Sequence, residues 1–142
     1  MMGSMAYWYN IGLLVLNAQK NKFLVCEKAP NDVTDLYIMP GGQMEGETAK
    51  ECLERTIKKE VGCGVDPDSL EYIGEYADTA AGAPDRDVAI DLYRGKLLGE
   101  PEPTGDIKRL HWVGKEDVDN PRLSPIVRNQ IIPSLVDKGI LE

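Results

Sequence analysis

One short segment of the chain carries most of the residues that could do chemistry: Gly41, Gly42, Glu47, Arg55 and Glu60. Two adjacent glycines let backbone amides and carbonyls approach a bound group closely, because no Cβ stands in the way. Carboxylates such as that of Glu60 are the oxygen ligands that Mg²⁺ prefers. The segment therefore indicates a loop followed by a helix that together bind a metal ion or a charged ligand.

A helix is predicted between the glycines and Glu60, from Thr48 to Val61. This stretch has no glycine or proline, and its apolar residues recur every three or four positions, which is the helical period. Thr48 is suited to cap the N-terminus, with Glu51 three residues later completing a capping box. Gly62 can end the helix in the left-handed conformation. The helix thus begins and ends at definite residues.

Strands are predicted on both sides of this helix. Runs of β-branched and aromatic residues bounded by turn formers indicate strands at residues 7–16, 23–28, 36–40, 70–78, 87–98 and 107–114. The first two are expected to form an antiparallel pair through a short turn. Three strands, a helix, three strands and a second helix predict an α/β fold, in which a mixed sheet packs against helices.

The second helix is predicted over residues 124–141. Ser124 is expected to cap it, because Pro125 directly afterwards suits the first helical position. Pro133 must kink this helix or restart it, since an interior proline lacks a backbone N–H and clashes with the preceding turn.

Length and composition indicate one globular domain spanning residues 1–142. Residues 1–5, Met-Met-Gly-Ser-Met, look like the remnant of an expression tag or a disordered end. The formal net charge of −8 disfavours nucleic acid and anionic membranes as partners. No apolar run reaches the ~20 residues of a membrane span. We therefore expect a cytoplasmic protein.

The spacing within the segment resembles the signature of a known family. From Gly41, five residues precede Glu47, seven more precede Arg55, and Glu60 and Gly62 follow. This pattern is similar to the Nudix box, G-x5-E-x7-R-E-U-x-E-E-x-G-U, in which U is an aliphatic residue.

The resemblance to the box runs from Gly41 to Cys63, and the predicted elements around it resemble the Nudix fold from about Trp8 to Leu135. Only the box is specific. The resemblance implies an α/β/α sandwich with a mixed β-sheet and two main helices.

The resemblance also implies metal-dependent hydrolysis of a phosphoric anhydride. Family members place three glutamates on one edge of the helix to hold Mg²⁺ or Mn²⁺, which screens the phosphates and activates water. Here Glu60 would be the metal ligand and catalytic residue, with the backbone carbonyl of Gly41 completing the coordination. The implied substrate is a small nucleoside triphosphate or a nucleoside diphosphate-linked compound.

Other roles follow from the same resemblance. Glu47 and Arg55 are counted with Glu60 among the catalytic residues, and they are expected to pair with each other or with the ligand glutamates and so to fix the geometry of loop and helix. Gly41 and Gly42 would contact the substrate. Lys28, at the end of the second predicted strand, is a candidate phosphate contact, although a lysine that protects a sheet edge is an alternative.

Two of the three expected metal ligands are missing. Thr56 and Lys59 stand where the family has glutamates, and only Glu60 remains. At about 100° per residue, Thr56 lies about 40° and Lys59 about 100° from Glu60, on one side of the helix. Glu54 falls on the other side, so it does not replace them.

The loop departs from the family pattern as well, because it is one residue shorter. Gly41 rather than Gly42 matches the glycine of the box, and which of the two would face a metal stays open. An acid outside the segment could replace a lost ligand. Asp106, in the loop before the strand at 107–114, is the first candidate, and Asp85 and Asp87 are others. A solvated turn residue is the alternative for Asp106.

Two other functions remain open. A Nudix fold without catalysis could serve as a nucleotide-binding or protein-interaction module, because Lys59 repels a cation and suits a phosphate. A sugar-nucleotide hydrolase resembling the GDP-mannose mannosyl hydrolases would also lack both glutamates, but it uses a histidine base. The one histidine here, His111, lies in a predicted strand with its face undetermined. A homodimer is open for each function.

Overall fold

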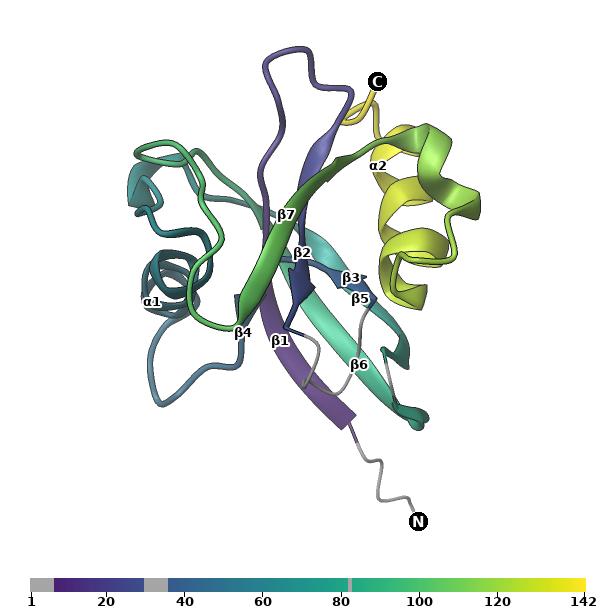
Figure 1. Cartoon of the computed structure of the whole chain (residues 1–142), viewed down its shortest axis with the longest axis horizontal. Helices are drawn as coiled ribbons and strands as arrows, with labels where there is room; N and C mark the ends of the chain where they lie inside the picture. Colours follow the sequence, from purple (N-terminus) through teal and green to yellow (C-terminus); the bar gives the residue numbers. More distant parts are fainter. Residues whose placement is uncertain (1–6, 30–35, 82) are drawn as a thin grey trace.

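The computed structural model of the chain describes residues 7–29, 36–81 and 83–142 (Figure 1). The predicted tag remnant or disordered end at residues 1–5 lies outside these ranges. The strands are β1 (Tyr7–Leu14), β2 (Phe23–Lys28), β3 (Tyr37–Ile38), β4 (Gly41–Gly42), β5 (Glu71–Ala80), β6 (Ala83–Arg94) and β7 (Ile107–Val113). The helices are α1 (Ala49–Val61), α2 (Ile132–Asp137), the 3-10 turns Pro67–Ser69 and Lys115–Asp119, and the π-helix Val127–Ile131.

The strands form two sheets. The larger sheet has the order β4-β1-β6-β5, and it is mixed because β1 and β6 run parallel whereas the other neighbours run antiparallel. The smaller sheet has the order β3-β2-β7 and is antiparallel. The predicted α/β fold with a mixed sheet and two main helices is confirmed, and the described strands divide between two sheets rather than one.

The predicted pairing of the first two strands is wrong. A turn does join them, with the Asn17 amide donating to the Lys22 carbonyl at 3.0 Å, and one bridge follows between Leu16 and Phe23. Beyond that bridge, β1 pairs with β4 and β6 while β2 pairs with β3 and β7. Partners from distant segments have replaced the local one, which short-range turn signals do not reveal.

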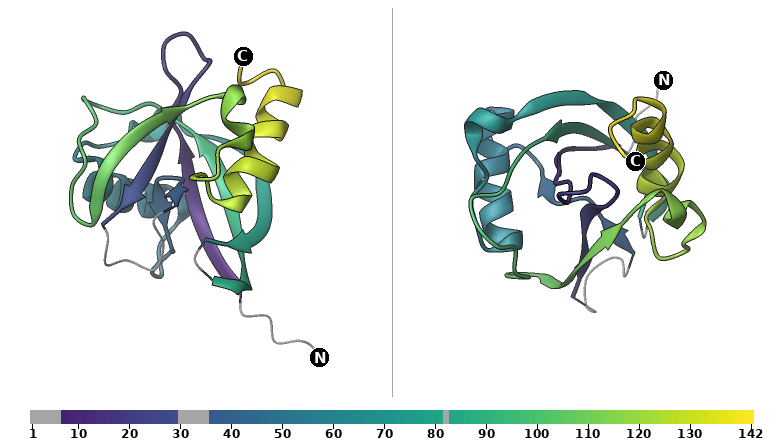
Figure 2. Two further views of the ribbon diagram at one scale, coloured as in Figure 1. Left: turned by 45° about the vertical axis from the view of Figure 1, so that its right-hand side comes forward. Right: turned by 90° about the horizontal axis from the view of Figure 1, so that it is seen from above.

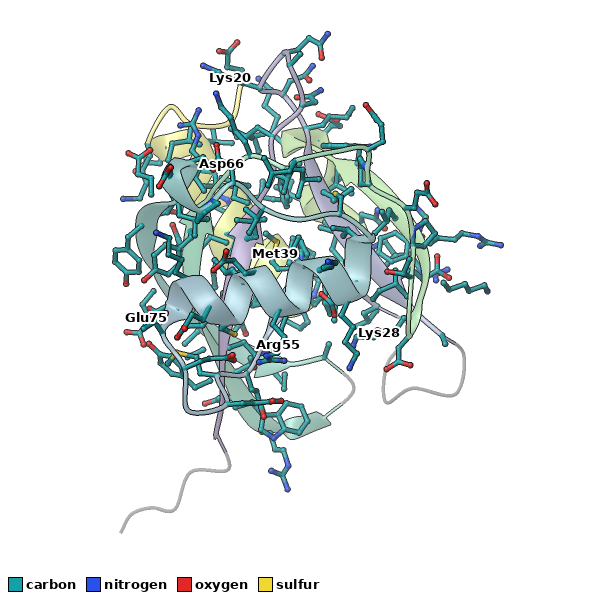
Figure 3. The ribbon with its side chains drawn as sticks, turned by 90° about the vertical axis from the view of Figure 1, so that its left-hand side faces the viewer. Lys20, Lys28, Met39, Arg55, Asp66 and Glu75 are labelled. Atoms are coloured by element: carbon teal, nitrogen blue, oxygen red, sulfur yellow. The ribbon has the colours of Figure 1, made fainter. Side chains whose placement is uncertain are left out.

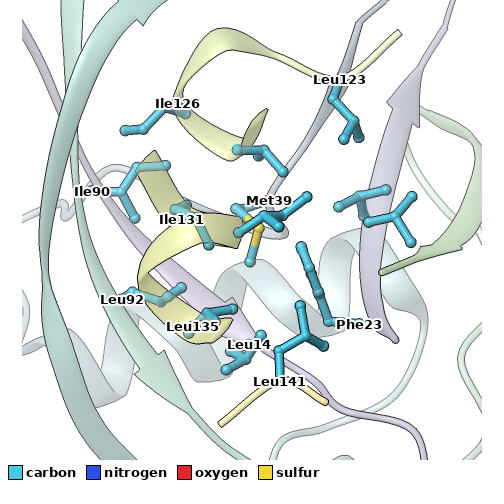
Figure 4. Packing of buried hydrophobic residues seen from close by; sticks show 14 of the residues in the cluster. Leu14, Phe23, Met39, Ile90, Leu92, Leu123, Ile126, Ile131, Leu135 and Leu141 are labelled. Carbon is cyan, nitrogen blue, oxygen red and sulfur yellow. The ribbon is translucent and has the colours of Figure 1, made fainter. Parts of the chain in front are cut away.

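Two apolar clusters hold the helices against the sheets. Successive residues of β1 face opposite sides of its sheet, so Leu13 packs with α1 while Leu14 packs with the C-terminal helices. The right-hand view of Figure 2 shows α1 and α2 on opposite sides of the strands. Figure 4 shows the larger cluster, which includes Phe23, Met39 and Leu135. The result is the α/β/α sandwich expected from the sequence.

The C-terminal helix starts close to its predicted position but has an unexpected interior. It becomes a π-helix at Val127–Ile131 and returns to an α-helix at Ile132, with Pro133 in the first turn of α2. The expected restart at Pro133 is therefore present. The expected Ser124 cap is not, because its buried hydroxyl has no hydrogen-bond partner among the described residues.

No helix in the described part of the chain is long and apolar enough to cross a membrane.

Candidate active site

The helix α1 carries the residues of the predicted site on its buried stripe. Thr48 accepts a hydrogen bond from the Glu51 amide and Glu51 returns one, while Gly62 caps the C-terminus at φ 73°, as predicted. Thr56 and Glu60 lie one turn apart among the buried apolar residues, at 6% and 9% exposure. Lys59 is exposed at the edge of this stripe.

Glu47 and Arg55 form the junction between loop and helix. The Arg55 Nε donates to both Glu47 carboxylate oxygens, at 3.1 and 3.2 Å, and a second guanidinium nitrogen donates to the Gln43 carbonyl at 2.9 Å. These hydrogen bonds lower the pKa of Glu47. Glu45 adds a longer ion pair with Arg55 at 3.6 Å. Arg55 thus fastens the loop to the helix that follows it.

The glycine pair is fixed by two close contacts. Gly41 has a φ of +135°, and a Cβ there would lie 2.0 Å from the Ile11 carbonyl oxygen, because β4 pairs closely with β1. A Cβ on Gly42 would lie 3.0 Å from the Thr56 methyl group. The sequence indicated that these glycines let the backbone approach a bound group closely. In the structure, the atoms that approach so closely belong to Ile11 and Thr56.

Glu60 meets the glycine pair and Lys28. Its Oε1 accepts a hydrogen bond from the Gly41 amide at 2.9 Å, and its Oε2 lies 3.7 Å from the Lys28 Nζ. Burial raises the pKa of Glu60, and the Gly41 amide, Lys28 and Lys59 oppose that rise. Figure 3 shows Lys28 and Arg55 along the same edge of α1. Both carboxylate oxygens of Glu60 are therefore engaged by positive groups.

A polar cavity of about 240 Å³ opens beside Glu60. Asp106 lines it together with Glu60, so the loop before β7 brings a second carboxylate to the same space. The full lining is Lys28, Gly41, Gly42, Gln43, Glu45, Arg55, Thr56, Lys59, Glu60 and Asp106. The residues placed first by the sequence for metal or phosphate binding, Lys28, the glycine pair, Glu60 and Asp106, all line this cavity, and Glu47 supports it through Arg55.

The two other acidic candidates do not contribute. Asp87 lies in β6 opposite Thr79 and lines neither of the cavities near Glu60. The side chain of Asp85 lies outside the described part of the structure.

An apolar cavity of about 290 Å³ adjoins the polar one. It extends between β1 and the segment that starts the C-terminal helix, and Trp8, Ile38, Met39 and Ile126 are among its apolar walls. The two cavities share Lys28, Gly41, Gly42, Gln43 and Glu60.

Two side chains of the apolar cavity each have a buried polar atom without a partner among the described residues. The Asn10 Oδ1 and the Ser124 Oγ are buried, and neither has a hydrogen bond within the described structure. Sequence reasoning missed both as site residues. Asn10 could have been found, because a lone amide in the apolar run of β1 needs a hydrogen-bond partner wherever the strand buries it. Ser124 was assigned to a helix cap instead.

His111 lies outside both cavities. Its Nε2 hydrogen-bonds Glu27 at 2.8 Å, and its ring stacks on Tyr37 with centroids 4.1 Å apart. The hypothesis of a carbon-attacking sugar-nucleotide hydrolase therefore has no histidine at the candidate site.

A family model described as a NUDIX domain matches residues 6–135. The chain belongs to the Nudix family. No curated protein matches it in a search by sequence.

Solved structures show the same Nudix fold. A MutT protein from Methanosarcina mazei Go1 matches with a TM-score of 0.74 and 17% identity, over 96% of this chain and 99% of that one. The ORF135 protein of E. coli gives 0.69 and 18%, over 96% and 94%. A MutT NUDIX hydrolase from Burkholderia pseudomallei gives 0.68 and 15%, over 92% and 96%. At these identities the likeness concerns the fold.

Members of the Nudix family generally use a divalent metal, but few oxygen donors near Glu60 are available to hold one. The described residues contain no group of three or more His, Cys, Asp or Glu side chains able to hold a metal ion. Glu60 is engaged by Gly41 and Lys28, and the Thr56 hydroxyl donates to the Cys52 carbonyl at 2.8 Å. The ammonium groups of Lys28 and Lys59 line the same cavity and repel a divalent cation. These residues do not fit a resident divalent ion.

Proposed function

We propose that this Nudix protein hydrolyses a phosphoric anhydride bond in a nucleoside triphosphate or a nucleoside diphosphate-linked compound. The observation that supports this best is the pair of joined cavities, one apolar and one charged, that meet at Lys28, Gly41 and Glu60. A ligand that spans both cavities would have one largely apolar end with a few polar atoms and one phosphorylated end. Hydrolysis adds water across the anhydride and leaves a phosphate on each product.

The apolar cavity suits the heterocyclic end of such a compound. Its walls are largely apolar, and an unpaired buried polar atom is costly until a ligand satisfies it. Asn10 offers an amide oxygen that accepts hydrogen bonds, and the Ser124 hydroxyl can donate or accept. A nucleobase with ring or exocyclic N–H groups meets these requirements.

The polar cavity suits the phosphates, with Lys28, Gly41 and Gly42 as the proposed substrate contacts. We propose that Mg²⁺ or Mn²⁺ enters as part of the substrate, bound to its phosphate oxygens, because the cavity does not fit an ion of its own. Glu60, Asp106 and the Gly41 backbone would then face the metal–phosphate group. Glu60 is the proposed catalytic residue, and Glu47 and Arg55 position it by holding loop and helix together.

The direct test is phosphate or monophosphate release from a panel of nucleotides with Mg²⁺ or Mn²⁺. We expect turnover by the parent and its loss in Glu60→Gln. Glu54→Gln is the matched control, because Glu54 is exposed on α1 and lines neither cavity. If Glu60→Gln turns over as fast as the parent, the proposed role of Glu60 is wrong.

A binding module without turnover is a second candidate. It is favoured by one observation, that Gly41 and Lys28 already engage both Glu60 oxygens. Calorimetric titration with the same nucleotides separates the two candidates. Binding without release of any product in Mg²⁺ or Mn²⁺ would support the module, whereas metal-dependent product release would support the hydrolase.

A further inference from the structure

The charges that line the polar cavity balance each other. Three side chains are cationic, namely Lys28, Arg55 and Lys59, and three are anionic, namely Glu45, Glu60 and Asp106. With the glutamates of the Nudix box at positions 56 and 59, the formal charge of this lining would be lower by three. The cavity has therefore lost the excess negative charge that attracts a divalent cation.

The three cations differ in how firmly they are held. Arg55 is bound by Glu47, Glu45 and the Gln43 carbonyl. Among the described residues, Lys28 has the 3.7 Å ion pair with Glu60 and no other, and its side chain is 22% exposed. Lys59 has no ion pair within the described ranges. Within the described structure, the ammonium groups of Lys28 and Lys59 are thus less firmly paired than Arg55, so an approaching anion has few ion pairs to displace.

The backbone of Lys59 is held by the loop before β7, so its side chain extends from a fixed position. The Thr104 hydroxyl donates to the Lys59 carbonyl at 2.6 Å, and the Gly105 backbone passes so close that a Cβ would lie 3.1 Å from the same oxygen. This contact joins the end of α1 to the loop that carries Asp106. The loop therefore fixes the backbone of Lys59, whose side chain lines the cavity.

We propose that the polar cavity binds a phosphate group directly through the ammonium groups of Lys28 and Lys59, with no divalent ion between them. The proposal deepens the proposed function, on which it rests for the phosphorylated ligand. Glu60 is the counter-charge of Lys28 in the free protein and opposes the anion. Binding is then independent of metal, and a divalent ion serves only the turnover step.

The test is calorimetric titration of the full chain with inorganic pyrophosphate in EDTA. We expect binding by the parent and a loss of at least about tenfold in affinity in Lys59→Gln, since hydrogen bonds to charged groups are worth more than neutral ones. Lys58→Gln is the matched control, because Lys58 is the adjacent exposed lysine on α1 and does not line the cavity. Equal affinities for the two variants would overturn the proposal.

Glu60→Gln gives a second readout with opposite expectations. If lysines bind the phosphate directly, removing the Glu60 charge releases Lys28, and pyrophosphate affinity in EDTA rises. If a metal ion bridges Glu60 and the phosphate, Glu60→Gln weakens pyrophosphate binding, and the parent binds pyrophosphate only with Mg²⁺ or Mn²⁺ present. The latter pair of results would overturn the proposal.

These results are separable from the fate of the proposed function. Pyrophosphate binding in EDTA without turnover of any nucleotide would overturn the hydrolase and leave the direct phosphate site in place. Turnover by a parent that binds pyrophosphate only in Mg²⁺ would do the reverse.

Discussion

Glu47 and Glu60 belong to the same loop and helix, yet their surroundings act on them in opposite directions. Hydrogen bonds from Arg55 lower the pKa of Glu47, whereas burial raises the pKa of Glu60. Glu47 helps to hold the loop on the helix, while Glu60 faces two cavities and lacks the neighbouring carboxylates of the Nudix box. The box has therefore kept the residues that hold loop and helix together, whereas of the three glutamates that would face the reaction it has kept only Glu60.

Of the substitutions near Glu60, we expect one at Gly41 to have the largest effect on stability. Gly41→Ala must move the Ile11 carbonyl and leave its backbone conformation, so we expect the free energy of unfolding to fall by more than about 3 kcal/mol. Denaturant unfolding measures this.

Gly46→Ala is the control in the same loop. Gly46 has a φ of +70°, but no atom lies within 4 Å of a Cβ placed there. We expect a cost of about 1 kcal/mol from the left-handed backbone alone. Equal costs for the two variants would show that contact with Ile11 does not matter.

Restoring the lost carboxylates should make the Glu60 end resemble the family pattern. The double variant Thr56→Glu with Lys59→Glu adds two oxygen ligands and removes one cation beside Glu60. We expect its affinity for Mn²⁺ to rise at least about tenfold, because ligand charge sets metal affinity. Electron paramagnetic resonance of free Mn²⁺ measures it, with Lys58→Glu as the control outside the cavity.

No gain in the double variant would contradict the view that lost carboxylates limit this site. The loop, one residue shorter than the family pattern, would then be the limiting feature.

The opposite pKa shifts of Glu47 and Glu60 predict opposite effects of pH on stability, and these effects are smaller than those of the substitutions above. The lowered pKa of Glu47 means that its contribution is present above about pH 4.5, the ordinary value, and is lost as the pH falls below it. Glu47→Gln should therefore destabilise the protein at pH 7 and approach the parent in acid. Thermal melts in EDTA across pH 3 to 7 would measure this.

The raised pKa of Glu60 gives the reverse sign. Its protonated form is favoured by folding, so the contribution of Glu60 to stability is greatest below about pH 4.5 and is lost as the pH rises through the folded pKa. Glu60→Gln should gain stability relative to the parent as the pH rises from 4 to 7. Parallel profiles for the Glu47 and Glu60 variants would contradict the contrast drawn between the two carboxylates.

Local signals made much of this molecule predictable. The capping box of α1 and its glycine end depend on neighbouring residues, and β2 has the predicted bounds. The shared cavity of Glu60 and Asp106 followed from the resemblance to a known box and its usual surroundings. These features are either short-range or carried by a specific motif.

Long-range packing explains what the sequence did not reveal. The separation of β1 from β2 depends on partners far along the chain. Asn10 and Ser124 line one cavity although most of the sequence lies between them. Ser124 has the residue type and position of a helix cap, and only its burial shows that its hydroxyl has no partner there. No local pattern encodes these encounters.

The parallel pairing of β1 with β6 has a consequence for how the chain folds. β1 lies inside its sheet between β4 and β6, and its residues Tyr7 to Leu14 pair with Asp87 to Arg94. During synthesis, β1 is made long before its parallel partner. Closing so long a stretch of chain slows folding relative to local pairing. Until β6 is made, the apolar β1 is also open to pairing with other chains, so low temperature, which weakens apolar association, should favour soluble expression.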